Sequence, residues 1–125
     1  MGFALAERDS GRNRPVLAIL GDGATNYSIQ ALYTAARHKL PVVFLMLNNG
    51  EYGILKAFAD QLGTKRVPAR DLPGLDFIAL ATGYGCAAFR VETSDAFAQA
   101  LRDAFARPGP TLLDVPITAA VAPLP

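Results

Sequence analysis

Four apolar runs recur along the chain, and each ends in turn-forming residues. They occupy residues 15–20, 41–47, 86–91 and 111–115. Runs of this length, bounded by Gly, Pro or Asn, predict β-strands. The first two runs contain no polar side chain, so we expect both strands to be buried on both faces of a parallel sheet.

Segments with helical spacing lie between these runs. One helix is expected to begin near Thr25 or Asn26 and to stop before Pro41, because apolar residues recur there every three or four positions. Residues 2–7 are expected to form the end of an earlier helix. Further helices are expected over residues 52–61, from Asp76 to Gly83, and from Thr93 to Phe105.

Strand and helix therefore alternate, as parallel strands with helical crossovers require. The pattern predicts an α/β fold, with a doubly wound, mainly parallel sheet that carries helices on both faces. A chain of 125 residues makes one domain. We expect this domain to cover residues 1–118 and residues 119–125 to form a loose tail.

Composition narrows the class of protein. The net charge of +1 gives no basic surface for nucleic acid. The single cysteine, Cys86, excludes a disulfide framework and a multi-cysteine zinc site. The apolar runs are far shorter than the roughly 18 residues of a membrane span, and the first residues lack the features of a secretory signal. We therefore expect a cytoplasmic protein without membrane or nucleic-acid partners.

Two polar segments come directly after the first two strands. They are Gly21-Asp22-Gly23 and Asn48-Asn49-Gly50-Glu51. In open α/β sheets, ligands bind beyond the carboxyl ends of the strands. Because the two segments end strands that follow each other in the sequence, we expect them to face one site.

The residue types in these segments favour a metal-bridged diphosphate. Gly21 and Gly23 let the backbone turn and approach a ligand, and the helix that follows directs its free amides at a phosphate. The Asp22 carboxylate would repel a phosphate unless a cation lay between them. Mg²⁺ suits this role, and the Asn49 amide oxygen and a backbone carbonyl near Glu51 offer further oxygen ligands.

The Gly21-Asp22-Gly23 motif and the Asn48-Asn49 pair, at the spacing found here, resemble the signature of thiamine-diphosphate-dependent enzymes. This resemblance implies thiamine diphosphate and Mg²⁺ as cofactors. It also implies that the Asp22 carboxylate, the Asn49 side chain and the Glu51 carbonyl bind the metal. The cofactor-binding residues that it implies are Gly21, Asp22, Gly23, Ala24, Thr25, Asn49, Glu51, Tyr52, Gly53 and Ile54, with the Tyr52 and Gly53 amides against the diphosphate.

Within this family, residues 26–36, 48–53 and 71–85 look most like the benzoylformate decarboxylase branch. The resemblance implies non-oxidative decarboxylation of a small 2-oxo acid, with Leu55 and Phe58 on the substrate side of the cofactor. It also implies a homo-oligomer in which a pyrimidine-type domain of a partner chain completes the site. The family's catalytic groups lie outside the matched stretch, so we expect no catalytic residue in this chain, which resembles the last domain of a larger enzyme.

Other interpretations remain open. The chain is alternatively an acetolactate synthase-like carboligase domain, or a non-catalytic module that binds Mg²⁺-diphosphate or only assembles with other chains. Leu55 and Phe58 have the spacing of helix residues in a core as well as of a substrate wall. A dinucleotide site is disfavoured, because Asn26 replaces the third glycine of that motif.

Overall fold

The computed structural model describes residues 1–64 and 67–119. The described residues form one parallel sheet with the strand order β1-β2-β4-β3. The predicted strands are confirmed, with bounds that shift by at most one residue. These strands are β1 (Val16–Gly21), β2 (Val42–Asn48), β3 (Ala87–Arg90) and β4 (Thr111–Pro116).

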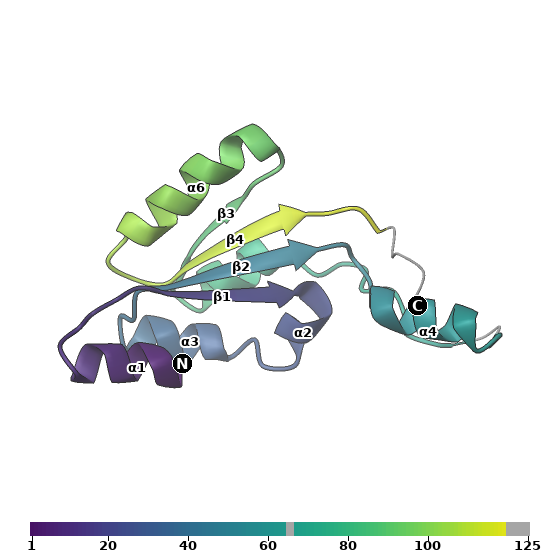
Figure 1. Cartoon of the computed structure of the whole chain (residues 1–125), viewed down its shortest axis with the longest axis horizontal. Coiled ribbons are helices and arrows are strands. Elements are labelled where there is room, and N and C mark those ends of the chain that lie inside the picture. Colours follow the sequence, from purple (N-terminus) through teal and green to yellow (C-terminus); the bar gives the residue numbers. More distant parts are fainter. Residues whose placement is uncertain (65–66, 120–125) are drawn as a thin grey trace.

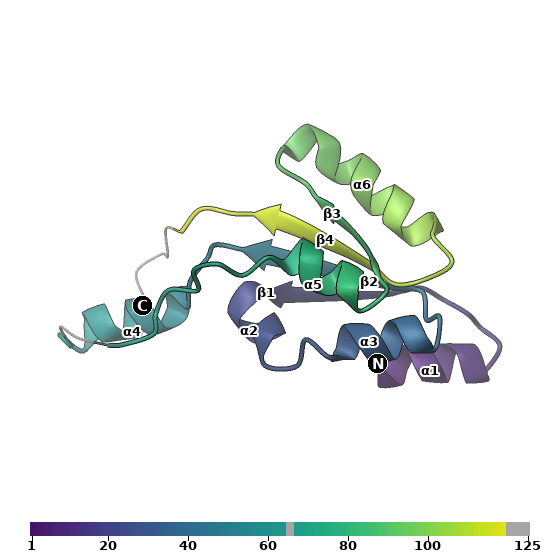
Figure 2. The ribbon, with the colours of Figure 1, turned by 180° about the vertical axis from the view of Figure 1, so that it is seen from behind.

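Helices cover both faces of this sheet, so the predicted doubly wound architecture is confirmed (Figures 1 and 2). Three helices, α1, α3 and α5, pack on one face, and α6 packs on the other. Helix α4 lies apart from the sheet, beyond the ends of the strands. The helices are α1 (Gly2–Asp9), α2 (Asp22–Asn26), α3 (Ala31–Arg37), α4 (Gly53–Gln61), α5 (Phe77–Gly83) and α6 (Ser94–Ala106).

Local signals set several of these bounds. The Asp76 side chain accepts a hydrogen bond from the Ala79 N–H at 2.9 Å and so caps α5. Thr93 caps α6 in the same way, through the Ala96 N–H at 3.3 Å. Such caps satisfy amides that have no partner within the helix, and each stabilises its helix by about 1 kcal/mol.

The two central strands contribute core residues to both faces of the sheet. Successive side chains of a strand point to opposite faces. Leu112 therefore packs with Phe44 towards α3 and α5, while Leu113 packs with Leu45 towards α6. All four side chains are buried, and burying a side chain of this size stabilises the fold by about 1.5–3 kcal/mol.

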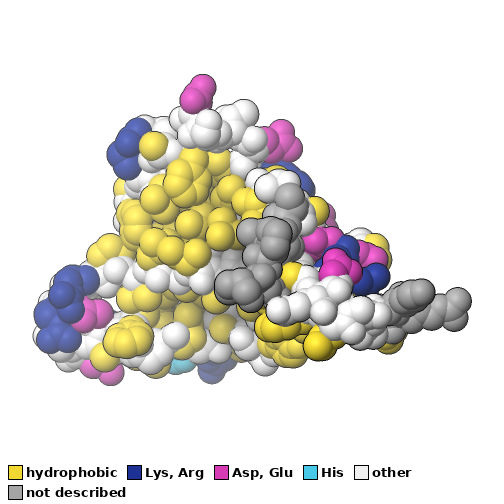
Figure 3. Space-filling model, turned by 45° about the vertical axis from the view of Figure 1, so that its right-hand side comes forward, with side chains coloured by type: hydrophobic (Ala, Val, Ile, Leu, Met, Phe, Trp, Pro, Cys, Tyr) yellow, Lys and Arg dark blue, Asp and Glu magenta, His cyan; other side chains and the backbone are white. Residues whose placement is uncertain are grey.

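The prediction that β1 is buried on both faces is wrong. Leu17 is 38% exposed and Ile19 is 60% exposed, whereas the alternate residues of β1 are half-buried. Helix α6 packs over β2 and β4, and nothing in the described part of the chain covers β1 on that side. Figure 3 shows hydrophobic side chains gathered on this side of the molecule.

The single helix predicted from near Thr25 to before Pro41 is interrupted. Helix α2 begins earlier, at Asp22, and α3 resumes at Ala31. Between them, the Ser28 N–H donates to the Thr25 carbonyl and the Ala31 N–H donates to the Ser28 carbonyl. These are three-residue turns, tighter than the α-helical four, so the apolar spacing is kept while the helix breaks.

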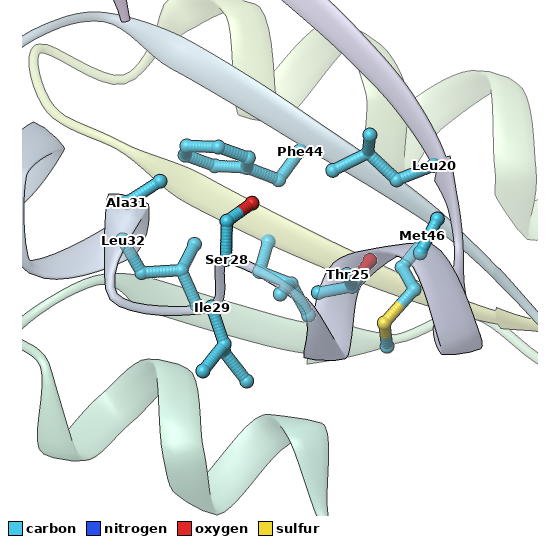
Figure 4. Close-up of a pocket in the computed structure, with 10 residues that line it drawn as sticks. Leu20, Thr25, Ser28, Ile29, Ala31, Leu32, Phe44 and Met46 are labelled. Carbon is cyan, nitrogen blue, oxygen red and sulfur yellow. The ribbon is translucent and has the colours of Figure 1, made fainter.

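A small cavity of about 50 Å³ lies beneath this break. The side chains of Leu20, Phe44 and Met46 reach it from the strands, and those of Ile29 and Leu32 reach it from the opposite side (Figure 4). The lining is mainly apolar, so the cavity belongs to the packing of α2 and α3 on the sheet.

An ion-pair cluster joins α1 to the segment that leads into β1. The Glu7 carboxylate accepts hydrogen bonds from Arg14, at 2.7 and 2.9 Å, and from Arg12, at 3.1 and 3.3 Å. The bonds from Arg14, followed by those from Arg12, lower the pKa of Glu7 to about 2. The carboxylate therefore stays charged at any ordinary pH and holds α1 in place.

In the described residues, no helix has both the length and the hydropathy that crossing a membrane requires. The expected tail over 119–125 lies outside the described residues, except for Ala119.

Candidate functional site

The Asp22 carboxylate joins the ends of β1 and β2. Asp22 follows β1 directly, opens α2 and is only 3% exposed. Its Oδ1 accepts the Gly23 N–H at 2.8 Å, and its Oδ2 accepts the Gly50 N–H at 2.7 Å. The two polar segments are therefore brought together, as the sequence predicted, and a buried carboxylate lies where they meet.

The loop after β2 is folded tightly around its own polar groups. Gly50 has a φ of 72°, a conformation that costs little only for glycine. The Asn49 Oδ1 accepts the Glu51 N–H at 3.2 Å. This side chain thus stays beside the loop, one residue from the Gly50 amide that Asp22 holds.

A short antiparallel pairing fixes Glu51 in the same loop. Glu51 forms a β-bridge with Asp71, flanked by the bonds Tyr52 N–H to Arg70 carbonyl and Leu72 N–H to Gly50 carbonyl, both at 2.8 Å. In this arrangement the paired residues direct their own N–H and C=O groups away from each other. No N–H donor of the described residues reaches the Glu51 carbonyl, which leaves this oxygen available as a ligand.

Lys56 reinforces this pairing from α4. Its ammonium group lies between two carboxylates, in contact with Glu51 and 2.6 Å from Asp71. The hydrogen bond to Asp71, followed by that to Glu51, raises the pKa of Lys56, and the same lysine lowers the pKa of Asp71. We refer to residues 50–52 and 70–72, with this ion-pair cluster, as the 50/70 ribbon.

The two glycines of the first motif differ in whether their positions have room for a side chain. A Cβ on Gly23 would lie 2.5 Å from the Tyr52 ring, so the close approach of that ring requires glycine. A Cβ on Gly21 would meet nothing within 4 Å, and Gly21 has a φ of −80°. The turn at Gly21 therefore does not depend on glycine, whereas the close approach of a ligand to Gly21 stays a prediction.

The remaining predicted binding residues lie around these groups. Thr25 is buried and donates from its hydroxyl to the Gly21 carbonyl at 2.8 Å, whereas Ala24 is exposed at the same turn of α2. The Tyr52 N–H donates to the Arg70 carbonyl at 2.8 Å, and its expected place against a diphosphate stays a prediction. No acceptor in the described segments bonds to the Gly53 or Ile54 N–H, and these amides open α4 towards the loop.

Leu55 and Phe58 lie outside the core. They are 45% and 48% exposed, on the helix that stands apart from the sheet (Figures 1 and 2). Ile54 is exposed beside them, and the buried positions of α4 are Gly53 and Ala59. The interpretation of Leu55 and Phe58 as core residues of this domain is therefore excluded.

The contacts of Asn48 and the whole contribution of Asp114 escaped prediction. The Asn48 Nδ2 donates to Asp114 Oδ1 at 3.0 Å, and the Asn48 Oδ1 accepts the Gly50 N–H at 3.1 Å. Asp114 is 2% exposed on β4. The signal available in the sequence was a charged residue inside the apolar run of β4, because a buried charge needs a partner.

The oxygen atoms at this site suit a hard cation that also binds ligands from outside the protein. They are a carboxylate oxygen, an amide oxygen and a free carbonyl oxygen, which are ligands that Mg²⁺ accepts. The described residues contain no group of three His, Cys, Asp or Glu side chains that could hold a metal by themselves. Further oxygens, such as those of a diphosphate, would have to complete the coordination.

Comparison with known proteins identifies the family. The pattern of the family described as thiamine pyrophosphate enzyme, C-terminal TPP binding domain, matches residues 1–115. The chain belongs to this family. Its fold superimposes on the crystal structure of benzoylformate decarboxylase from Polynucleobacter necessarius with a TM-score of 0.95 and 45% identity, covering 98% of this chain and 23% of that one.

Two relatives place this thiamine pyrophosphate-binding domain within the family. Benzoylformate decarboxylase of Pseudomonas aeruginosa is 46% identical over 103 residues, which are 82% of this chain and 20% of the relative. Acetolactate synthase of Bacillus subtilis is 33% identical over 102 residues, which are 82% of this chain and 18% of the relative. The chain thus spans about a fifth of these relatives and is more similar to the decarboxylase.

Proposed function

We propose that this chain is the diphosphate-binding domain of a thiamine-diphosphate-dependent enzyme that decarboxylates a small 2-oxo acid, as benzoylformate decarboxylases do. The observation that carries the proposal is the buried Asp22 carboxylate, which accepts amides from both strand-end loops. A carboxylate at the start of a helix that also faces a diphosphate needs a cation between the two anions.

The metal would be held by the Asp22 carboxylate, the Asn49 side-chain oxygen and the Glu51 carbonyl. The free carbonyl of Glu51 and the folded Asn49 side chain support this set. The diphosphate would lie against the first turn of α2, over Gly23, Ala24 and Thr25, and against the amides of Gly53 and Ile54. Tyr52 would contribute its ring, which packs on Gly23.

Thiamine diphosphate, when bound, supplies the electron-accepting group that loss of carbon dioxide requires. The residues of this chain bind and orient it, and they contribute an apolar wall. Leu55 and Phe58, exposed on α4, would form this wall on the substrate side. A wall without charged atoms favours a 2-oxo acid with an apolar side chain.

A pyrimidine-type domain of a partner chain would complete the active site in a homo-oligomer, located in the cytoplasm. The exposed apolar face of α4 and the open side of β1 support such assembly, because contiguous apolar surface marks contact sites. An acetolactate synthase-like carboligase is the second candidate, supported by the relative of that name at 33% identity.

Calorimetry tests the metal and diphosphate site on the purified chain. Thiamine diphosphate should bind only with Mg²⁺ present, and Asp22→Asn should abolish the Mg²⁺-dependent part. Asp103→Asn, at an exposed acid of α6, is the matched control and should bind as the parent does. Equal binding by Asp22→Asn and the parent would reject the metal assignment.

Product analysis separates the two enzyme candidates. Benzoylformate or pyruvate is supplied to the assembled enzyme with both cofactors. Benzaldehyde and carbon dioxide from benzoylformate support the decarboxylase, whereas acetolactate from pyruvate supports the carboligase. If neither is formed although cofactor binds, the domain serves only binding or assembly, and the proposed reaction is wrong.

A further inference from the structure

Asp114 is a buried charge outside the set of candidate metal ligands. It lies within β4 between Leu113 and Val115 and is 2% exposed. A carboxylate in such a place is costly unless hydrogen bonds satisfy it. Its closest partner is the Asn48 Nδ2 at 3.0 Å, and Arg90 follows at 3.6 Å from its other oxygen.

This contact fixes which way the Asn48 amide faces. An ionised carboxylate only accepts hydrogen bonds, whereas an asparagine amide has a donating end and an accepting end. Asp114 therefore holds the NH₂ group of Asn48 towards β4. The oxygen of the same amide must then face the loop after β2, where it accepts the Gly50 N–H at 3.1 Å.

The Gly50 N–H is the point where three strands are linked. It is shared between Asn48 Oδ1 and Asp22 Oδ2. A continuous series of hydrogen bonds thus connects Asp114 on β4, through Asn48 and the Gly50 N–H at the end of β2, to Asp22 at the end of β1. Because this N–H belongs to the peptide plane between Asn49 and Gly50, the same contacts set the backbone that carries Asn49 and leads into the 50/70 ribbon.

We propose that Asp114 is a positioning residue, which orients the loop of residues 48–51 through the Asn48 amide and thereby raises the affinity of the site for Mg²⁺. The part that concerns the metal rests on the proposed function. Removing a residue that holds a metal ligand in its orientation, without touching the metal, typically lowers metal affinity about 10–100-fold. Asp114 needs no contact with the metal or the coenzyme to have this effect.

An ion pair with Arg90 is the competing explanation for why β4 carries a buried carboxylate at position 114. The Arg90 side chain is half exposed, and its nitrogen lies 3.6 Å from Asp114, which exceeds a normal hydrogen bond. If that pair were the reason for Asp114, Arg90→Leu would disturb the loop as much as any change of Asp114. If Asn48 is the reason, Arg90→Leu leaves the loop nearly unchanged.

Hydrogen exchange of the Gly50 amide, measured by NMR on the metal-free chain, tests the positioning role alone. We expect Asp114→Leu to speed this exchange at least about tenfold, because Asn48 loses the acceptor that orients it. Asp114→Asn keeps an acceptor oxygen and should stay within about threefold of the parent. Arg90→Leu and the exposed-acid control Asp103→Leu should do the same. Unchanged Gly50 exchange in a folded Asp114→Leu chain would overturn the proposal.

An exchange of the two residues covers the case in which Asp114→Leu does not fold. Asn48→Asp sets two carboxylates against each other and should expose the Gly50 amide. Adding Asp114→Asn restores a donor opposite a carboxylate, with the roles reversed, and should return the Gly50 exchange rate to within about threefold of the parent. A double variant no better than Asn48→Asp would overturn the proposal.

Calorimetry with Mg²⁺ and thiamine diphosphate tests the consequence for the site. Asp114→Leu should weaken the Mg²⁺-dependent binding about 10–100-fold, and Asp114→Asn should recover most of it. Binding at parental strength by Asp114→Leu would overturn the effect on affinity. Absence of binding in the parent would refute the proposed function instead, and the Gly50 exchange, measured without ligand, still decides the positioning role.

Discussion

Replacing Gly23 by alanine tests the packing of Tyr52 on the start of α2. The new Cβ would lie 2.5 Å from Tyr52 Cε1 and 2.6 Å from Cδ1. Carbon atoms in ordinary contact are about 3.5–4.0 Å apart, so the ring must retreat by about 1 Å. Its movement also disturbs the contact with Tyr27, whose ring centroid is 6.5 Å away.

Two opposing effects set the size of the change. Overpacking costs about 1–3 kcal/mol, while alanine in place of glycine favours a helix by up to about 1 kcal/mol. Because Tyr52 is only half-buried and can yield, we expect a net loss of about 1 kcal/mol, which lowers Tm by about 4 °C in a domain of this size. Gly21→Ala is the matched control and should leave Tm unchanged, since a Cβ there meets nothing within 4 Å.

Urea unfolding followed by circular dichroism measures the effect in two backgrounds. In the parent, Gly23→Ala should destabilise the chain. In a Tyr52→Ala background the obstacle is gone, so the same change should stabilise it by up to about 1 kcal/mol. The coupling energy between the two sites is then about 2 kcal/mol. The same ΔΔG for Gly23→Ala in both backgrounds would refute the packing argument.

Three further predictions follow from the ion pairs and the open strand. The pKa of Glu7 is lowered from 4.5 to about 2, so the stability it contributes is complete above pH 4.5 and is lost as the pH falls towards 2. Glu7→Gln should therefore lower the urea midpoint at pH 7 and converge with the parent in acid; a constant difference at every pH would contradict this. Lys56→Met should speed amide exchange of Leu72 up to about fivefold by removing the ion pairs of the 50/70 ribbon, and unaltered exchange would argue against that role. Ile19→Lys should reduce self-association through the open face of β1, as measured by sedimentation velocity; a parent chain that stays monomeric at high concentration would contradict it.

The elements that the sequence predicted well are those set by neighbouring residues. The caps at Asp76 and Thr93 act over three positions, and the predicted helices begin where those bonds form. The strands were predicted equally well, because a short apolar run with turn-forming residues on both sides is typical of a buried strand. The meeting of Asp22 with the loop after β2 followed from topology, since parallel strands end at the same edge of a sheet.

What the sequence could not supply depends on contacts between distant elements. Whether β1 is covered on its second face depends on where α6 crosses the sheet, and the sequence of β1 gives no information about the position of α6. The requirement for glycine at position 23 comes from the Tyr52 ring. Asp114 and Asn48 lie 66 residues apart in the chain, so their pairing appears only once β2 and β4 lie side by side.

The way α4 is attached separates two properties of this protein. The helix projects from the body of the domain (Figure 1). Its large apolar side chains, those of Ile54, Leu55 and Phe58, are exposed and belong to neither core cluster. Exchanging Leu55 or Phe58 therefore carries little folding penalty. In the enzyme proposed above, the side chains on the substrate side are thus free to change without loss of the fold.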